Sequence, residues 1–129
     1  DVAKITDFSV LTHDDQDITE DVLQANRVLL FICYDLALSS TSNLAAIKEL
    51  GLAAAKDGVN VMVLSSAGAA QKDQFKKDND FPFDFYITDG IVLKTMVRAN
   101  PGIMYMEKGI VKGKWHDNDT PDYSVIQAL

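Results

Sequence analysis

The sequence predicts an α/β domain in which a mixed central sheet lies between two layers of helices. Apolar, β-branched runs of strand length alternate with longer segments that repeat apolar residues at helical spacing. Consecutive strand–helix–strand units require parallel strands with crossover connections, and a late strand pair joined by a Lys-Gly turn adds antiparallel pairing. At 129 residues the chain fits one domain, which we expect to span residues 1–129.

The charge and hydrophobicity of the sequence limit the kinds of partner it can bind. Twelve basic and nineteen acidic residues give a formal net charge of −7, which disfavours nucleic acid or an anionic membrane surface. No apolar run approaches the ~20 residues of a membrane-spanning helix, so we expect no direct membrane insertion by this segment. The chain begins DVAKITDF without an initiator methionine, and we therefore expect a processed or excised piece of a longer chain.

The predicted elements follow in chain order. They are a hairpin over 7–19, a helix over 19–24, a strand over 27–35, a helix over 42–57, a strand over 59–66, a helix over 67–80, a strand over 83–88, a helix over 90–99, paired strands over 103–107 and 110–115, and a terminal helix over 122–129. This order places helices on both faces of the sheet.

The first half rests on local patterns. Alternating apolar and polar residues around the polar turn HDDQ predict the hairpin, and Thr19, followed by two acids, is expected to cap the short helix after it. The run 27–35 is apolar throughout, which is typical of a central strand covered on both faces. The helix over 42–57 has apolar residues at helical spacing, and Gly58 stands where a left-handed C-terminal cap belongs.

The second half continues the alternation. VNVMVLSS is a second buried strand, and Ser66 or the small residues after it open a shorter, more polar helix. FDFYIT is a short strand and GIVLKTMVRA a helical stretch. Lys108 and Gly109 turn the chain between the two last strands, and Thr120 with Pro121 at the first helical position is expected to open the terminal helix.

Two stretches carry a resemblance to a known family. LLFICYDLALSSTSNLAAIKEL (29–50) resembles the LLxFWATWCPPC junction of the TlpA-like branch, and RANPGIMYMEKGIVKGKW (98–115) resembles that branch's VPTTFLID, G, xIV, W pattern. The likeness covers about residues 7–119 and implies the thioredoxin-like fold of thiol–disulfide oxidoreductases and peroxiredoxins, a three-layer α/β/α sandwich with a mixed central sheet and an N-terminal hairpin.

A narrower resemblance concerns the whole protein. The acidic hairpin, ICYDL, LKTMVRANPGIM and GKWHDNDTP together resemble a thioredoxin-like domain attached to DoxX-family integral membrane proteins of Bacteroidetes. That resemblance implies a membrane-associated location, with the periplasmic side as one option, and a tether to a transmembrane region outside this sequence.

The redox pair of the family is missing. The resemblance puts Ala37 and Ser40 where the two cysteines would be, and the single Cys33 cannot form an internal disulfide. Disulfide exchange needs a thiolate stabilised at a helix start and a second sulfur to resolve the mixed disulfide, so exchange by this chain alone is excluded. Cys33 is predicted to be a buried small hydrophobe; a single-cysteine peroxidase or reductase, which needs an exposed thiolate, is the alternative. We expect no catalytic residue, cofactor or metal.

A ligand groove is nevertheless expected beside the missing pair. The hydroxyl run Ser39–Ser42 either caps the helix or, with the helix N–H groups, binds an anion or a peptide carboxylate. Asp35 is expected to cap or turn the chain. The resemblance implies a cis bond before Pro101, with nearby backbone available to an extended peptide. The candidate binding residues are Asp35, Ala37, Ser39, Ser40, Thr41, Arg98, Asn100 and Pro101.

Two further groups have structural interpretations. The run 116–119, HDND, could chelate a cation, but its spacing matches no standard zinc site and a polar turn is favoured. Trp115 and the aromatic set Phe81, Phe83, Phe85 and Tyr86 are predicted to pack in the core and at its edge, although an exposed subset could dock a partner. The sequence therefore predicts a redox-inactive module that binds a peptide or protein partner, with a purely structural accessory domain as a further alternative.

Overall fold

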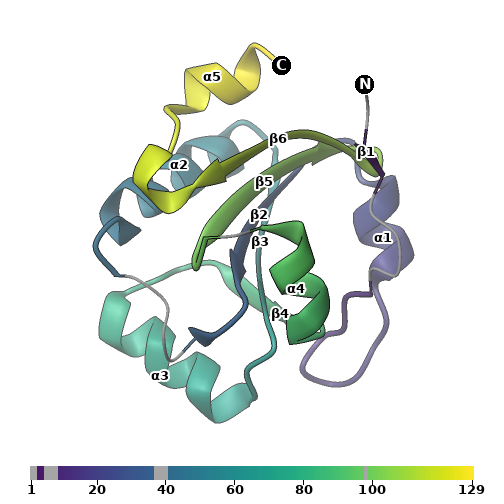
Figure 1. Ribbon diagram of the computed structural model, residues 1–129, viewed down its shortest axis with the longest axis vertical. Helices are drawn as coiled ribbons and strands as arrows, with labels where there is room; N and C mark the ends of the chain where they lie inside the picture. Colours follow the sequence, from purple (N-terminus) through teal and green to yellow (C-terminus); the bar gives the residue numbers. More distant parts are fainter. Residues whose placement is uncertain (1–2, 5–8, 37–40, 98) are drawn as a thin grey trace.

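The computed structural model describes residues 3–4, 9–36, 41–97 and 99–129. Its strands form one six-stranded sheet in the order β1-β6-β5-β2-β3-β4, with helices packed on both faces (Figure 1). The elements are β1 Ala3–Lys4, α1 Thr19–Gln24, β2 Val28–Cys33, α2 Leu44–Lys56, β3 Asn60–Ser65, α3 Ala69–Asn79, β4 Asp84–Ile87, α4 Gly90–Met96, β5 Gly102–Glu107, β6 Ile110–His116, a 3-10 turn Asp117–Asp119, and α5 Tyr123–Gln127. The predicted α/β sandwich with a mixed sheet is confirmed.

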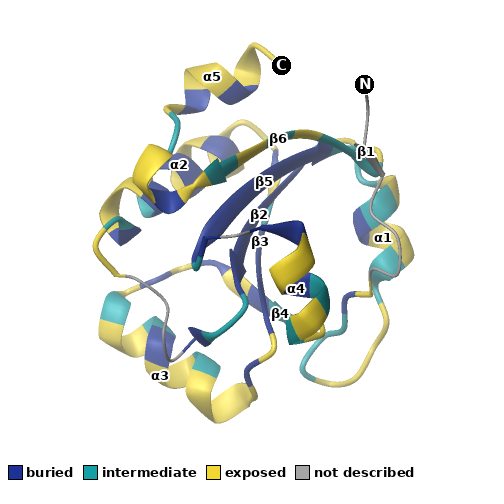
Figure 2. Ribbon diagram, in the orientation of Figure 1, coloured by how far each residue is buried: buried dark blue, intermediate teal, exposed yellow. Residues whose placement is uncertain are grey.

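Strand β2 is the centre of the sheet, as its uniformly apolar sequence predicts. It pairs parallel to β3 on one side and antiparallel to β5 on the other, and β3 in turn pairs parallel to β4. Every residue of β2 is buried, which Figure 2 shows as a dark blue strand. The backbone of β2 is hydrogen-bonded to a strand on each side, and its side chains are covered on both faces of the sheet. A polar side chain in β2 would therefore be removed from water.

Successive residues of β2 enter two separate cores. Leu29, Phe31 and Cys33 join a cluster that α2, α3 and α5 cover. Leu30 and Ile32 join a second cluster, on the opposite face, that α1 and α4 cover. This division follows from the two-residue period of a strand, which points neighbouring side chains to opposite faces.

The end of α2 has the predicted glycine cap. Gly58 adopts a left-handed conformation with φ of 84°. Its N–H donates to the carbonyl of Ala55 at 3.1 Å, and the N–H of Val59 donates to the carbonyl of Ala54 at 3.0 Å. This pair of bonds is the Schellman arrangement, which satisfies carbonyls that the helix end would otherwise leave open.

The N-terminal hairpin is shorter than the sequence suggests. Among the described residues its two arms meet in one antiparallel bridge, Leu11 with Asp17, and Leu11 also bridges to Ile87 of β4. The predicted cap at Thr19 is wrong: Ile18 is the N-cap, and Thr19 is the first helical residue of α1. The Thr19 hydroxyl instead accepts from the Val10 N–H at 2.9 Å, which holds the loop together before the helix begins.

The terminal helix also begins later than predicted. Asp122 is the N-cap of α5, and its carboxylate accepts from the Ser124 N–H at 3.4 Å. Thr120 and Pro121 therefore lie before the helix. The Thr120 hydroxyl donates to the Asp117 carbonyl at 2.6 Å and closes the 3-10 turn. A carboxylate two residues further along, that of Asp122, takes the cap position instead.

Asp57, just after α2, fastens α5 to the rest of the molecule. Its carboxylate accepts from the Tyr123 hydroxyl at 2.6 Å and from Arg27 Nη1 at 3.2 Å. The hydrogen bond from Tyr123, followed by the one from Arg27, holds the pKa of Asp57 below its ordinary value of 3.8. The ionised carboxylate thus connects the helix that follows β6 to the loop before β2.

Asp57→Asn is expected to remove part of the acid sensitivity of folding. A carboxyl whose pKa is lowered by folding stabilises the folded state above its unfolded-state pKa, and this contribution disappears as the pH falls through the lowered value. Wild type should therefore be more stable than the variant at neutral pH, and the difference should shrink below pH 3.8. Urea unfolding over a pH series measures it, with exposed Glu49→Gln on the same helix as control. Parallel pH profiles for wild type and Asp57→Asn would contradict the assignment.

Candidate functional site

The candidate site lies at the edge where β2 ends and β5 begins. The peptide bond between Asn100 and Pro101 is cis, as the resemblance implies. Asn100 Nδ2 donates to the Asp35 carbonyl oxygen at 2.7 Å, which ties the loop before β5 to the loop after β2. The other side-chain atom, Asn100 Oδ1, is buried and has no hydrogen-bond partner within the described residues. The loop is thus held in place, while none of the described residues donates to this oxygen.

The structure brings together some of the predicted site residues. Asp35, Asn100 and Pro101 meet through the bond between Asn100 and Asp35. The Asp35 contact uses its backbone carbonyl, which agrees with a turn role. The predicted residues Ala37, Ser39, Ser40 and Arg98 lie outside the described residues.

Thr41 lies beside a different cavity. This cavity has a volume of about 270 Å³ and is lined by Thr41, Leu36 and side chains of α3, among them Gln71 and Gln74. Thr41 is exposed, and its carbonyl accepts from the Leu44 N–H at 3.3 Å. It therefore supports the first turn of α2 through its backbone.

The start of α2 is capped one residue beyond the hydroxyl run. Asn43 is the N-cap, and its side chain makes no capping bond. Instead Asn43 Nδ2 donates to Asp117 Oδ2 at 3.0 Å and to Asn118 Oδ1 at 2.8 Å. The N-cap position therefore lies one residue beyond the hydroxyl run, and the N-cap side chain binds the loop after β6.

The HDND run therefore serves the fold. Asp117 is 4% exposed, and Asp117 Oδ1 lies 2.9 Å from Nδ1 of the neighbouring His116. Its other oxygen accepts from Asn43. Within the described part of the chain, no cluster of three or more His, Cys, Asp or Glu residues is suited to a metal ion. A pairing between Asn43 and Asp117, 74 positions apart, leaves no local signal in the sequence.

Cys33 lies where the sequence predicts it. It ends β2 opposite Ser65 of β3 and is 2% exposed. A catalytic thiol must be accessible and its thiolate stabilised by positive charge. Burial between two strands gives no access, so the structure disfavours the single-cysteine enzyme.

We expect Cys33 to react slowly with a polar thiol reagent while the protein is folded. Its sulfur is covered by the core that α2, α3 and α5 close, so reagent must wait for an opening of the structure. Labelling with iodoacetamide at neutral pH, followed by mass spectrometry, should be slow in buffer and prompt in denaturant. Rapid labelling of the folded protein would overturn the burial of Cys33.

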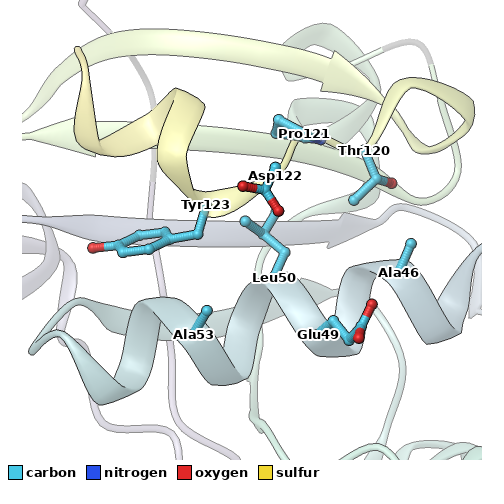
Figure 3. A pocket seen from close by; sticks show the side chains of 8 residues that line it. All are labelled: Ala46, Glu49, Leu50, Ala53, Thr120, Pro121, Asp122 and Tyr123. Atoms are coloured by element: carbon cyan, nitrogen blue, oxygen red, sulfur yellow. The ribbon is translucent and has the colours of Figure 1, made fainter.

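Two larger cavities were not predicted. One, of about 520 Å³, lies between the end of α4 and β6 and adjoins the candidate site through Ala99; its walls include Lys94, Met96, Ala99, Lys114, Trp115 and His116. The other, of about 420 Å³, lies between one flank of α2 and the start of α5 (Figure 3). No residue of the Asn100–Pro101 loop lines the second cavity. The groove between α4 and β6 is therefore the cavity that extends the candidate site.

Comparison with known proteins identifies the fold. No protein-family model matches the chain, and no curated protein matches it in sequence. A thiol:disulfide interchange protein from Bacteroides sp. superposes with a TM-score of 0.71 at 10% identity, over 99% of this chain and 88% of that one. BsSco, a Sco-family cytochrome c oxidase assembly protein, gives 0.69 at 10% identity over 98% and 91%. The exposed lipoprotein thioredoxin Etrx1 of Streptococcus pneumoniae gives 0.65 at 18% identity over 94% and 95%.

The chain has the thioredoxin-like fold. The expectation from the two resembling stretches is thereby confirmed at the level of architecture. Identities of 10–18% establish the fold alone and carry over no activity. The thioredoxin-like fold here contains a single, buried cysteine. None of the helices in the described ranges is long and apolar enough to cross a membrane.

Proposed function

We propose that this chain is a thioredoxin-fold binding or docking module that works without disulfide exchange. It binds an extended segment of a peptide or protein partner beside the Asn100–Pro101 loop. The main support is that the 2.7 Å hydrogen bond from Asn100 to the Asp35 carbonyl fixes this loop. The single cysteine of the sequence is buried in β2. The chain thus keeps the cis-proline loop that the resemblance assigns to peptide binding, although it presents no exposed cysteine there.

The chemistry of such binding needs no thiol. An extended peptide that adds to exposed backbone gains main-chain hydrogen bonds, and its side chains give specificity. Asn100 Oδ1 supports this proposal, because it is buried without a donor among the described residues, which is costly, and an incoming N–H would satisfy it. The orientation of the amide follows from the donation of Nδ2 to the Asp35 carbonyl.

The proposal is tested by separating binding from redox turnover. S-alkylated insulin B chain serves as an extended, redox-inert probe, and intact insulin as a disulfide substrate. We expect the probe to shift the NMR amide signals of Asp35 and Asn100, with no reduction of insulin and no consumption of peroxide. Cys33→Ser should bind the probe as wild type does, because the sulfur lies within the core.

Two outcomes would refute this function. Catalytic reduction of insulin or peroxide that disappears in Cys33→Ser would establish a single-cysteine enzyme. Absence of shifts around Asn100 at millimolar probe would remove the binding site. The same NMR and turnover measurements on Glu49→Gln, a substitution at an exposed position of α2, serve as a control for effects that any substitution would have.

Attachment to a membrane protein is part of the same proposal. The resemblance of the hairpin, the ICYDL strand and GKWHDNDTP to the soluble domain of DoxX-family proteins supports it. The partner would then be presented at a membrane surface, with the periplasmic side as one option. The sequence of the full-length gene product tests this point: flanking apolar segments of about 20 residues are expected, and their absence would refute the tether.

A further inference from the structure

The cavity of about 520 Å³ between α4 and β6 has cationic walls. Lys94 belongs to α4 and Lys114 to β6, and both side chains are exposed. His116 stands at the same wall as Lys114, and none of the described residues that line the cavity is acidic. This is a local departure in a chain with a net charge of −7. We call this cavity the α4–β6 groove.

Both lysines are positioned by contacts within the protein. Lys114 Nζ donates to the Met96 carbonyl at 3.2 Å, at the end of α4 where the helix dipole favours a cation. An ammonium group has three N–H donors, so this one bond leaves others for a ligand. Lys94 Nζ lies 5.7 Å from the centre of the Tyr34 ring, a distance at which the aromatic face attracts the charge. The groove therefore presents two fixed positive charges.

The groove also has an apolar surface, and it borders a part of β6 whose outer edge no described strand covers beyond Val111. Met96, Val97 and Ala99 form the apolar part of its lining, whereas the half-buried Trp115 side chain packs against the core on the opposite face of the sheet. Strand β1 pairs with β6 only at Ile110 and Val111 in the part of the chain that the structure describes. An extended chain can pair with such an edge, because its backbone groups are the complement of those the strand presents.

We propose that the α4–β6 groove binds an acidic, extended peptide segment of a partner protein. Carboxylates of the peptide accept from Lys94 and Lys114, and its backbone runs along β6 at Trp115. Charge complementarity selects this occupant, since a basic segment would meet three basic side chains and no acid among the described lining residues. The inference goes beyond the function proposed above, because the groove can be filled whether or not a peptide also pairs beside Asn100.

The test uses two labelled peptides of equal length, one alternating glutamate with threonine and the other lysine with threonine. Binding is followed by fluorescence anisotropy and by the NMR amide signals of the protein. We expect the acidic peptide alone to bind, to shift signals of Lys94, Ala99 and Trp115, and to bind more weakly as salt screens the exposed charges. Lys114→Glu and Lys94→Glu should each weaken binding about tenfold or more, because each loses a charge-assisted hydrogen bond.

A matched control separates the groove from net charge. Lys77→Glu makes the same change in charge on α3, which packs with the other sheet face, and should leave affinity unchanged. Lys94→Glu leaves the hydrogen bond between Lys114 and Met96 in place. If Lys114→Glu does not fold, the affinity of Lys94→Glu for the acidic peptide tests the site. Shifts by S-alkylated insulin B chain at Asn100 should persist in the lysine variants, so the two proposals fail separately.

Several outcomes would overturn the inference. Equal binding of the lysine peptide, equal weakening by Lys77→Glu, or shifts away from the α4–β6 groove would each remove the acidic-peptide site. Vesicles containing phosphatidylserine serve as a further arm. Binding to them without binding to the acidic peptide would show that the groove meets an anionic membrane surface instead.

Discussion

Phe81→Ala is expected to lower the free energy of unfolding by about 3–5 kcal/mol. Phe81 is 3% exposed in the loop between α3 and β4. Its ring centroid lies 5.1 Å from that of Phe83, 5.9 Å from Phe75 and 6.1 Å from Phe31. Truncation leaves a cavity among three aromatic side chains and removes edge-to-face and tilted ring contacts.

Equilibrium unfolding in guanidinium chloride measures the loss. Phe81→Leu keeps most of the buried volume and should cost clearly less than alanine, which keeps the comparison useful if Phe81→Ala is unfolded. Ile91→Ala is the matched surface control, since Ile91 is 76% exposed and its truncation should change stability by about 0.5 kcal/mol or less. A loss below about 1 kcal/mol for Phe81→Ala would contradict the packing of this cluster.

Features that depend on neighbouring residues were predictable from the sequence. The uniform apolar run around Phe31 predicted the central strand, and Gly58 predicted the end of α2. The burial of Cys33 followed from its place in that run. The cis bond before Pro101 followed from the resemblance, because an X-Pro dipeptide by itself favours the trans form.

Features that depend on distant partners were not predictable. In the sequence Asn43 is a polar residue after a hydroxyl run, with no sign of its partner. Its hydrogen bond to Asp117 forms only because the fold brings the two residues together. Lys94 and Lys114 lie on different elements and have ordinary exposed-lysine neighbourhoods in the sequence, so their common groove becomes visible only when α4 packs beside β6. The Phe81 cluster is intermediate: the sequence indicates aromatic packing, while the identity of each contact comes from the register of β3 and β4.

The candidate site likewise combines features that the sequence predicted with features that only the structure shows. The resemblance indicated the loop at Asn100, and the structure adds its hydrogen bond to Asp35 and an acceptor oxygen that no described residue uses. Neither is encoded locally, since 65 positions separate the two residues. Proposals about a ligand therefore depend on geometry at this loop and in the α4–β6 groove more than on any short motif.

Gly51→Ala is expected to destabilise the protein, although alanine is the better helix former. Helix propensity alone favours alanine over glycine by about 1 kcal/mol within a helix such as α2. However, a methyl group at Gly51 would come within 2.8 Å of Phe83 Cε2 and 2.9 Å of Phe31 Cε2. Overpacking of this kind costs about 1–3 kcal/mol, so the close approach of α2 to β2 outweighs the propensity.

Thermal and urea unfolding would determine the sign of this effect. Ala53→Gly, at an exposed position further inside the same helix, measures the propensity term and should cost about 1 kcal/mol. Combining Gly51→Ala with Phe83→Leu should recover part of the loss, because the leucine side chain vacates the space that the new methyl group needs. A more stable Gly51→Ala would mean that α2 packs further from the aromatic cluster, which would also weaken the packing argument for Phe81.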